Sequence, residues 1–437
     1  MSVPNLQRHL ERLASSDALA VHGKVLDVVG LTIEATGPPT RIGDLCYVQS
    51  GDSASRIPVE VVGFRGNRIL LMPLADSRGI GPDSVLIPTH APLKFRAGDE
   101  LIGRVIDGLG NPIDGGPPLR GGREVNVMAS APRAMDRRRI TEAITTGVRA
   151  IDATATCGKG QRIGVMAGSG VGKSKLMGMI ARNTNADISV IALIGERGRE
   201  VRDFIEVDLG DSGLERSIVV VATSDEPALV RIKGAYLATA IAETFRSQGS
   251  DVMLMMDSIT RFAMAQREVG LAVGEPPTSK GYPPSVFSLL PKLLERAGRD
   301  QSGSITGVYT VLVEGDDMLD PIADAVRSML DGHVVLSRDL ASRGHYPAVD
   351  VLESISRVML DVTSEAHQKA ASKMRQVMAT FRDAEDLVNI GAYVKGSNPE
   401  IDEALVLMPK IRKFLQQELF EPSDLEGITE GILQALS

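Results

Sequence analysis

The hydrophobic pattern along the chain begins with an amphipathic segment. Between residues 3 and 14 apolar side chains recur every three or four positions with charged ones opposite them, and Ser-Ser-Asp at residues 15–17 ends the pattern. This spacing predicts a short helix within residues 1–20. Such a helix either folds onto its own domain or docks on a partner protein, and its terminal position favours docking.

From residue 21 to residue 95 the pattern changes to short β-type runs separated by turn residues. The runs are KVLDVVGLTIEA, RIGDLCYV, IPVEVVGF and RILLMPL, and the turns contain Gly-Pro, Gly-Asp and Gly-Asn pairs. Strands at this spacing predict a small β-barrel. The runs lack regularly placed aromatic and basic residues, which favours a structural or ring-forming role over RNA binding.

Residues 96–360 combine continuous apolar runs with helical segments. A Gly- and Pro-rich stretch from Gly98 to Gly122 predicts a linker or the start of this domain. Helices are expected near residues 173–183, 226–247 and 319–331, and strands at RIGVM, ISVIALIG, SIVVVA, DVMLMMD, ITGVYTVLV and HVVL. Continuous apolar strands that alternate with helices predict an α/β fold whose parallel sheet is covered on both faces.

The last part of the chain has no strand pattern. The segments SEAHQKAASKMRQVMATF and PEIDEALVLMPKIRKFLQQEL both carry helical periodicity. Residues 361–437 are therefore predicted to form a helical C-terminal domain.

A candidate phosphate-binding loop lies between an apolar strand and a helix. Its sequence from Ala167 to Ser174 is AGSGVGKS, with alanine where the motif usually has its first glycine. Glycines let successive backbone N–H groups point at the β-phosphate, and the helix N-terminus adds its positive dipole end. We expect Lys173 to bridge the β- and γ-phosphates and the Ser174 hydroxyl to bind Mg²⁺. The other residues expected to bind the nucleotide are Gly168, Ser169, Gly170, Val171 and Gly172.

Two other strands lead to carboxylates that suit phosphoryl transfer. Asp257 follows an apolar run and could hold Mg²⁺ or its water, although a strand-ending Asp can also cap the next turn. Glu196 follows ISVIALIG and could orient the attacking water. A surface Glu paired with Arg197 or Arg199 would have the same spacing, so the sequence pattern leaves both readings of Glu196 open.

The composition narrows the function classes. A formal net charge of −8 argues against bulk electrostatic binding of nucleic acid, and nine Phe, six Tyr and no Trp make a base-stacking surface unattractive. Two cysteines, Cys46 and Cys157, point to a reducing compartment. The chain starts without the pattern of a secretory signal and has no run of 18 apolar residues, so it is expected to be soluble and cytoplasmic.

Several segments together resemble the catalytic-subunit lineage of the rotary ATPases. They are TTGVRAIDATATCGKGQRIGVMAGSGVGKS, GERGREVRDF, MMDSITRFAMAQRE, GYPPSVFSLLPKLLERAG and RGHYPAVDVLESISRVM. Within this lineage the chain most resembles the homohexameric ATPases of flagellar protein export and type III secretion. The resemblance implies a RecA-like P-loop core, ATP and Mg²⁺ at the site, Glu196 as the catalytic carboxylate and Asp257 as the acidic metal partner.

The resemblance also implies roles that spacing alone does not mark. Arg261 would reach the γ-phosphate, and Arg357 would be an arginine finger that enters a neighbour's site, with an intrasubunit salt bridge as the alternative. Tyr346 would stack on adenine, unless it only packs at the junction of the sheet and the helical domain. A second adenine-pocket aromatic would come from the helical domain, where Phe414 and Phe420 are both candidates.

The function predicted from this resemblance is the ATP-hydrolysing motor of flagellar type III protein export. The implied partners are a stator-like export regulator on the N-terminal helix, a central stalk protein, the export gate, export substrates and their chaperones, with no nucleic acid. The implied location is the inner face of the bacterial cytoplasmic membrane.

Four alternative functions remain open. They are the catalytic subunit of a rotary ATP synthase or vacuolar-type pump, the ATPase of a virulence-type injectisome, a noncatalytic regulatory subunit, and a ring RNA helicase or transcription terminator. GSNPEIDEAL and LLPKLLERAG favour the secretion branch over the pumps, and GAYVKGSNPEID favours its flagellar side. The presence of Glu196 opposes a noncatalytic subunit, and the acidic charge opposes an RNA helicase.

Overall fold

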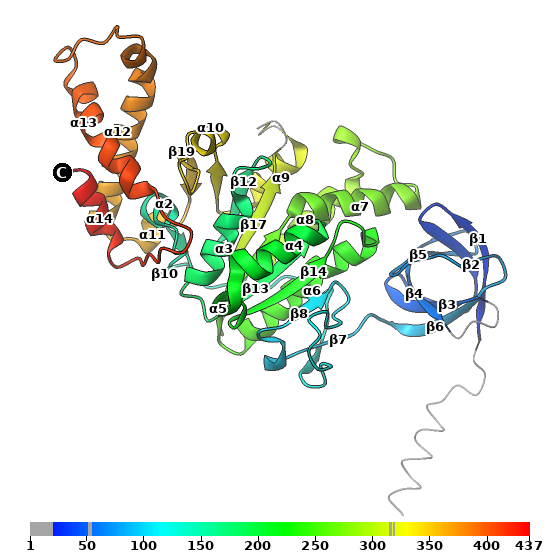
Figure 1. The fold of residues 1–437 in the computed structure, drawn as a ribbon. Helices are drawn as coiled ribbons and strands as arrows, with labels where there is room; N and C mark the ends of the chain where they lie inside the picture. Colours follow the sequence, from blue (N-terminus) through cyan, green and yellow to red (C-terminus); the bar gives the residue numbers. More distant parts are fainter. Residues whose placement is uncertain (1–20, 51–54, 314–316, 318–319) are drawn as a thin grey trace, which may run out of the picture. The chain divides into compact units, whose positions relative to one another are not determined.

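The computed structural model describes residues 21–50, 55–313, 317 and 320–437 (Figure 1). The predicted helix of residues 1–20 lies outside the described residues. The described chain divides into two compact units. One unit ends at Leu93 and includes Ala272–Gly274, and the other contains the rest from Lys94 to Ser437.

The first unit is a closed antiparallel β-barrel, which confirms the small barrel predicted from the sequence. Its strands close in the order β1-β2-β5-β4-β3-β6, and β6 pairs back onto β1. In β3 every second side chain is buried, because successive residues of a strand point to opposite faces. The strands are β1 (Gly23–Val29), β2 (Thr32–Thr36), β3 (Asp44–Gln49), β4 (Arg56–Arg65), β5 (Arg68–Pro73) and β6 (Val85–Pro92).

The second unit is built on a mostly parallel sheet, as the apolar runs predicted. The strand order is β19-β18-β12-β17-β15-β13-β14-β8, with β16 paired on β17. All residues of the inner strands β13 and β14 are buried, which explains why these runs are continuously apolar. The strands are β8 (Val105–Asp107), β12 (Arg162–Ala167), β13 (Ile188–Ile194), β14 (Ser217–Ala222), β15 (Asp251–Asp257), β16 (Gly298–Arg299), β17 (Ser304–Leu312), β18 (Gly332–Leu336) and β19 (Val349–Ser356).

The two edge strands are differences from the sequence prediction. β8, which the pattern did not predict, lies inside the Gly- and Pro-rich stretch and pairs in parallel with β14, so of the two predicted roles of this stretch the start of the domain fits and the linker does not. Three residues are too few to show a hydrophobic period. β19 pairs antiparallel with β18, and its mixed burial pattern hides the strand in the sequence.

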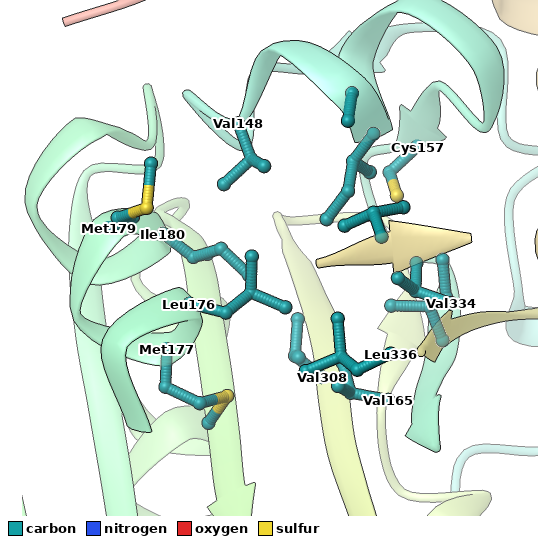
Figure 2. Close-up of a cluster of buried hydrophobic side chains, with 14 of the residues drawn as sticks. Val148, Cys157, Val165, Leu176, Met177, Met179, Ile180, Val308, Val334 and Leu336 are labelled. Carbon is teal, nitrogen blue, oxygen red and sulfur yellow. The ribbon is translucent and has the colours of Figure 1, made fainter. Parts of the chain in front are cut away.

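Helices cover the sheet on both faces. α3 (Lys173–Asn183) packs Leu176, Met177 and Ile180 against alternate residues of the sheet, among them Val165 and Val308 (Figure 2). α6 (Ala228–Ser247) packs on β13, β14 and β15 and is not part of that cluster, so it covers the opposite face. The bounds of α3 coincide with the range predicted from the sequence.

The C-terminal segment is helical, as predicted. α12 (Glu365–Asn389), α13 (Pro399–Leu415) and α14 (Ile428–Ala435) pack on one another and on α2 (Arg149–Thr154). The side chains of Ser364 and Asn398 cap the N-termini of α12 and α13 by accepting backbone N–H bonds. Among the described residues, no helix combines the length and hydrophobicity that a membrane crossing requires.

The remaining elements connect these layers. The short strands are β7 (Phe95–Ala97), β9 (Arg123–Val125), β10 (Ala143–Ile144) and β11 (Cys157–Gly158). The other α-helices are α4 (Gly198–Asp203), α5 (Gly210–Leu214), α7 (Ile259–Val273), α8 (Pro284–Leu294), α9 (Pro321–Met329), α10 (Arg338–Ser342) and α11 (Met359–Val362). The 3₁₀ turns are η1 (Asp99–Leu101), η2 (Ala134–Asp136) and η4 (Ser279–Gly281), and η3 (Phe204–Leu209) is a π-helical turn.

Candidate nucleotide-binding site

The glycine-rich loop connects β12 to α3 at the carboxyl end of the parallel sheet. Gly170 and Gly172 have φ of 80° and 96°, in the left-handed region that favours glycine. Gly172 also precedes α3 and offers no side-chain cap, so the first N–H groups of the helix are left for a ligand. The Val171 side chain is buried in the core and anchors the loop, so Val171 could reach a nucleotide only through its backbone.

The loop forms one wall of a cavity of about 660 Å³, which we call the phosphate cavity. The cavity is lined by most of the residues predicted from the sequence to bind phosphates, namely Gly168, Ser169, Gly170, Gly172, Lys173, Ser174, Glu196 and Arg261. Seven residues that sequence reasoning did not assign to phosphate also line it, namely Ala167, Lys175, Arg197, Glu200, Leu312, Val313 and Arg338. Two predicted residues, Val171 and Asp257, lie behind the lining.

Lys173 is held between two carboxylates at the floor of this cavity. Its Nζ lies 3.1 Å from Oε1 of Glu196 and also contacts Oδ1 of Asp257. Glu196 follows β13 and Asp257 ends the neighbouring strand β15, and parallel pairing brings the two strand ends together. Burial opposes the charge of Lys173, but the two carboxylates outweigh it and raise the pKa of Lys173, so its ammonium is charged.

Asp257 is the most enclosed member of this cluster. Its side chain is 5% exposed, and Oδ1 accepts a hydrogen bond of 2.8 Å from Oγ1 of Thr310. Burial raises the pKa of Asp257, and the Lys173 ammonium opposes that rise. These contacts hold the carboxylate behind Lys173 instead of capping a turn.

The residues at this end of the sheet fit Mg²⁺ only as an ion that the phosphates also bind. Within the described residues, no cluster of three or more His, Cys, Asp or Glu could hold a metal by itself. Ser174 lines the phosphate cavity, and the Asp257 carboxylate lies behind the lining, in contact with Nζ of Lys173. Mg²⁺ suits such a place because it keeps several waters and takes phosphate oxygens with one or two protein ligands.

Arg261 lies in the first turn of α7, beside the strand end that carries Glu196. A Cβ at Gly195 would lie 2.7 Å from Cβ of Arg261, so only glycine allows this approach. The guanidinium contacts Sδ of Met264 through Nη1 at 3.8 Å, and its buried Nε has no hydrogen-bond partner. No carboxylate of the described residues pairs with this charge, and Arg261 lines the cavity, as binding of a phosphoryl group requires.

A second cavity of about 700 Å³ adjoins the first, and we call it the base cavity. Tyr346, Leu176, Met179 and Leu419 supply much of its lining. Tyr346 is about half exposed, and its ring lies next to the loop, because a Cβ at Gly172 would be 3.6 Å from its Cε1 atom. A flat aromatic ring in an apolar cavity beside a phosphate loop suits the binding of a nucleobase.

The two phenylalanines considered for the base cavity do not line it. Phe414 lies under the guanidinium of Arg149, and Phe420 lies 4.7 Å from that of Arg182. The helical segment contributes Leu419 to the cavity instead. Leu419 follows a helical segment and belongs to no motif, so nothing in the sequence marked it as a cavity residue.

Arg357 does not join this cluster. Its backbone N–H donates to the carbonyl of Asp331, whose own N–H donates to the carbonyl of Arg162 at the start of β12. The loop follows the other end of β12, so the sheet separates Arg357 from the phosphate cavity of its own chain. Arg357 is exposed, and no carboxylate within the described residues lies within ion-pair distance of it, which disfavours the intrasubunit salt bridge.

The fold and the site define a class of protein. A P-loop lies between a buried strand and a helix, and the neighbouring strands carry carboxylates to the same edge of the sheet. This arrangement, with a base cavity beside the loop, places the chain among the P-loop nucleoside triphosphatases.

Comparisons with known proteins identify the family. The ATP synthase alpha/beta family nucleotide-binding domain matches residues 147–356, and the T3SS EscN ATPase C-terminal domain matches residues 363–434. The chain is similar to the "Flagellum-specific ATP synthase" of Bacillus subtilis, with 56% identity over 96% of each chain, and to that of Salmonella typhimurium, with 48% identity over 96% and 95%. The chain belongs to the family of flagellum-specific ATP synthases and type 3 secretion system ATPases.

Solved structures support the same assignment. The chain is similar to the assembled ATPase EscN of the enteropathogenic E. coli type III secretion system, with a TM-score of 0.90 and 45% identity. This similarity covers 95% of the chain and all of EscN. A second structure, of assembled EscN in complex with its central stalk EscO, matches with a TM-score of 0.88.

Proposed function

We propose that this chain hydrolyses ATP with Mg²⁺ in a homohexameric ring and drives flagellar type III protein export. The observation that carries the proposal is the separation of Arg357 from the phosphate cavity. The cavity contains the residues that grip phosphates, and the exposed Arg357 lies at the far end of the same sheet. A site that contains both the phosphate-binding residues and an Arg357 side chain therefore needs two copies of the chain.

In the proposed mechanism the residues of one copy bind and orient the nucleotide. The loop N–H groups and Lys173 hold the phosphates, Tyr346 stacks on adenine, and Glu196 orients and polarises the attacking water. Mg²⁺, when bound at Ser174 near Asp257, offsets negative charge on the phosphates. Arg261 stabilises charge on the γ-phosphoryl oxygens.

The neighbouring copy completes the site. Its Arg357 enters the cavity and contacts the phosphoryl group as charge builds up in the transition state. Because this contact exists only when two copies meet, an isolated chain turns ATP over slowly.

The flagellar assignment rests on similarity at the level of the whole chain. The relatives named flagellum-specific ATP synthases reach 56% identity, and the "Type 3 secretion system ATPase" of Xanthomonas euvesicatoria is 48% identical. The second candidate function is the ATPase of a virulence-type injectisome, which the structural similarity to EscN favours.

The proposed partners follow from the same relatives. EscN was solved with its central stalk EscO, and a stalk protein is therefore proposed for this chain. A stator-like regulator on the N-terminal helix, the export gate, substrates and chaperones complete the proposed set, with no nucleic acid. The proposed location is the cytoplasm, at the inner face of the cytoplasmic membrane.

The test is Mg²⁺-dependent release of phosphate from ATP by the intact assembly. Lys173→Ala should abolish it, because the variant loses the ammonium that holds the β- and γ-phosphates. Lys369→Ala is a matched control, since Lys369 forms an exposed pair with Glu365 on α12. An assembly shown to be intact that releases no phosphate with Mg²⁺ would contradict the proposal.

A further inference from the structure

The side chain of Lys175 lies where the phosphate cavity and the base cavity meet. Of the described residues, Gly170, Gly172 and Lys175 are the three that line both cavities. The loop places the β-phosphate on one side of this junction, and Tyr346 places the base on the other. The α-phosphate must lie between them, next to Lys175, the charged residue that both linings share in the described part of the chain.

Lys175 is held at this junction by a single carboxylate. Its Nζ donates to Oδ1 of Asp208 at 2.5 Å. The Lys175 side chain is 53% exposed, whereas that of Asp208 is 5% exposed. Because the Lys175 end of the pair is half exposed, the ammonium can turn from Asp208 to a phosphate oxygen, but the buried Asp208 carboxylate then needs another cation nearby.

A second cationic side chain, that of Arg182, lies near Asp208. Arg182, two turns further along α3, has a buried Nη1 with no hydrogen-bond partner among the described residues, and the Asp208 carboxylate acts on the guanidinium electrostatically. The Nη2 of Arg182 donates to the carbonyl of Leu419, and its guanidinium stacks on Phe420. Arg182 can therefore offset the charge of Asp208 when Lys175 leaves.

The backbone of Asp208 is fixed against α3. Asp208 belongs to the π-helical turn η3, a form of helix that is frequent at functional sites. A Cβ at Gly178 would lie 2.6 Å from the carbonyl oxygen of Asp208, so the turn and the helix are in close contact. The Asp208 carboxylate can therefore exchange one cationic partner for another by side-chain movement alone, while the backbone of η3 stays in place.

We infer that Lys175 is a nucleotide-binding residue that recognises the α-phosphate of nucleoside di- and triphosphates, and that Asp208 holds the Lys175 ammonium while no nucleotide is bound. When the phosphate accepts the ammonium of Lys175, the Asp208 carboxylate passes to Nη1 of Arg182. This inference rests on the proposed nucleotide site and adds to it a residue outside the residues expected from the loop motif.

The experiment measures binding of ADP and adenosine to the full chain by titration calorimetry. Lys175→Met should weaken ADP about tenfold, the usual effect of losing one charge-assisted hydrogen bond, and leave adenosine unchanged. Lys175→Arg should restore most of the affinity. Lys373→Met is the control, because Lys373 forms an ion pair of 2.6 Å with Glu403 away from both cavities.

Asp208→Asn separates the role of Asp208 as a competing partner of Lys175 from a purely structural role. The variant removes the competitor for the ammonium, so ADP should bind a few-fold more tightly, and Lys175→Met should cancel this gain in the double variant. In steady-state assays Lys175→Met should raise KM about tenfold with kcat within about twofold, since the contact exists before and during phosphoryl transfer.

Two results would overturn the inference. One is equal ADP affinity of Lys175→Met or Lys175→Gln and the wild-type chain. The other is a loss of ADP affinity in Asp208→Asn as large as that in Lys175→Met, which would mean that Lys175 acts only by holding η3. A wild-type chain that binds no ADP would instead contradict the proposed function itself.

Discussion

The two ends of the parallel sheet are built in opposite ways. At the carboxyl end, Lys173, Glu196 and Asp257 form a compact cluster in which each side chain is less than 15% exposed. At the amino end, Arg357 is exposed and has no carboxylate within ion-pair distance in the described chain. β12 separates the two ends by about 16 Å at the usual rise of a strand.

This contrast shows how a chain can carry both halves of an active site without joining them. Charges that must hold a ligand are prearranged by buried contacts, which removes the cost of ordering them on binding. A charge that acts on a neighbour has to remain exposed in its own chain. The contrast therefore predicts that the two ends respond differently to substitution.

Arg357→Ala should have the largest effect that separates the two ends. We expect kcat to fall about 10³- to 10⁵-fold, which is the usual contribution of an arginine finger to kcat. ADP affinity should stay unchanged, because Arg357 lies far from the loop of its own chain. Phosphate release by the assembly and ADP titration measure the two quantities. Unchanged kcat in an intact assembly would end the trans role of Arg357.

Mixing two inactive chains sharpens this test. Lys173→Ala keeps the finger, and Arg357→Ala keeps the loop. Random co-assembly of equal amounts should restore roughly a quarter of the wild-type activity, because roughly a quarter of the interfaces join an intact loop to an intact finger. Absence of rescue in mixtures proven to co-assemble would count against a shared site.

Glu196→Gln should have the next largest effect and should act at the carboxyl end alone. The amide keeps the shape of the side chain but cannot polarise water, so kcat should fall about 10²- to 10⁴-fold while ATP still binds. Single-turnover assays with nucleotide titration check both points. Glu206→Gln is the control, since Glu206 pairs with Arg202 outside the cavity. Undiminished hydrolysis would remove Glu196 from the mechanism.

The sequence predicted the carboxyl end much better than the amino end. The loop motif marks the start of α3, because its glycines leave a helix N-terminus free for phosphate. The position of Arg357 at the amino end depends on the pairing of β18 with β19, and such a pairing cannot be recognised in a single sequence. β8 is too short to show a period at all.

Within the site, the sequence missed contacts that depend on the packing of the helical segment. The sequence could not decide whether Phe414 or Phe420 lines the base cavity. In the structure neither ring lines it, and each packs against the guanidinium of an arginine.

Lys175 had one visible signal in the sequence, its place two positions after the lysine of the loop motif. Its meaning depends on Asp208, which the fold brings to α3 from 33 positions away.

Tyr346→Ala should have a moderate effect limited to binding. Loss of one aromatic face should raise KM for ATP about fivefold with little change in kcat. Tyr346→Phe should behave as wild type, because the ring is what stacks. Phe420→Ala should leave KM unchanged, since Phe420 does not line the base cavity. A KM increase in Phe420→Ala equal to that in Tyr346→Ala would contradict the observed lining.

His367 joins the helical segment to the core. Its substitution should have the smallest effect, a change in how the free energy of unfolding depends on pH. Its side chain is 3% exposed, its Nε2 lies 3.1 Å from the carbonyl oxygen of Ala153, and its Nδ1 lies 3.0 Å from Oγ1 of Thr429. Burial lowers the pKa of His367, and the hydrogen bond to Ala153 opposes this only in part. The folded chain therefore keeps a neutral imidazole where an unfolded chain becomes protonated.

The sign of the resulting pH dependence follows from this difference. Below the unfolded pKa of 6.5 the unfolded state binds a proton that the folded state does not, so the free energy of unfolding falls as the pH decreases. The slope contributed by one such group is at most about 1.4 kcal/mol per pH unit. Between pH 6.5 and 5.5 the urea midpoint of His367→Gln should therefore fall less steeply than that of the wild-type chain. The two chains should run parallel above pH 7.5, and parallel curves over the whole range would mean that His367 takes up its proton in the folded state.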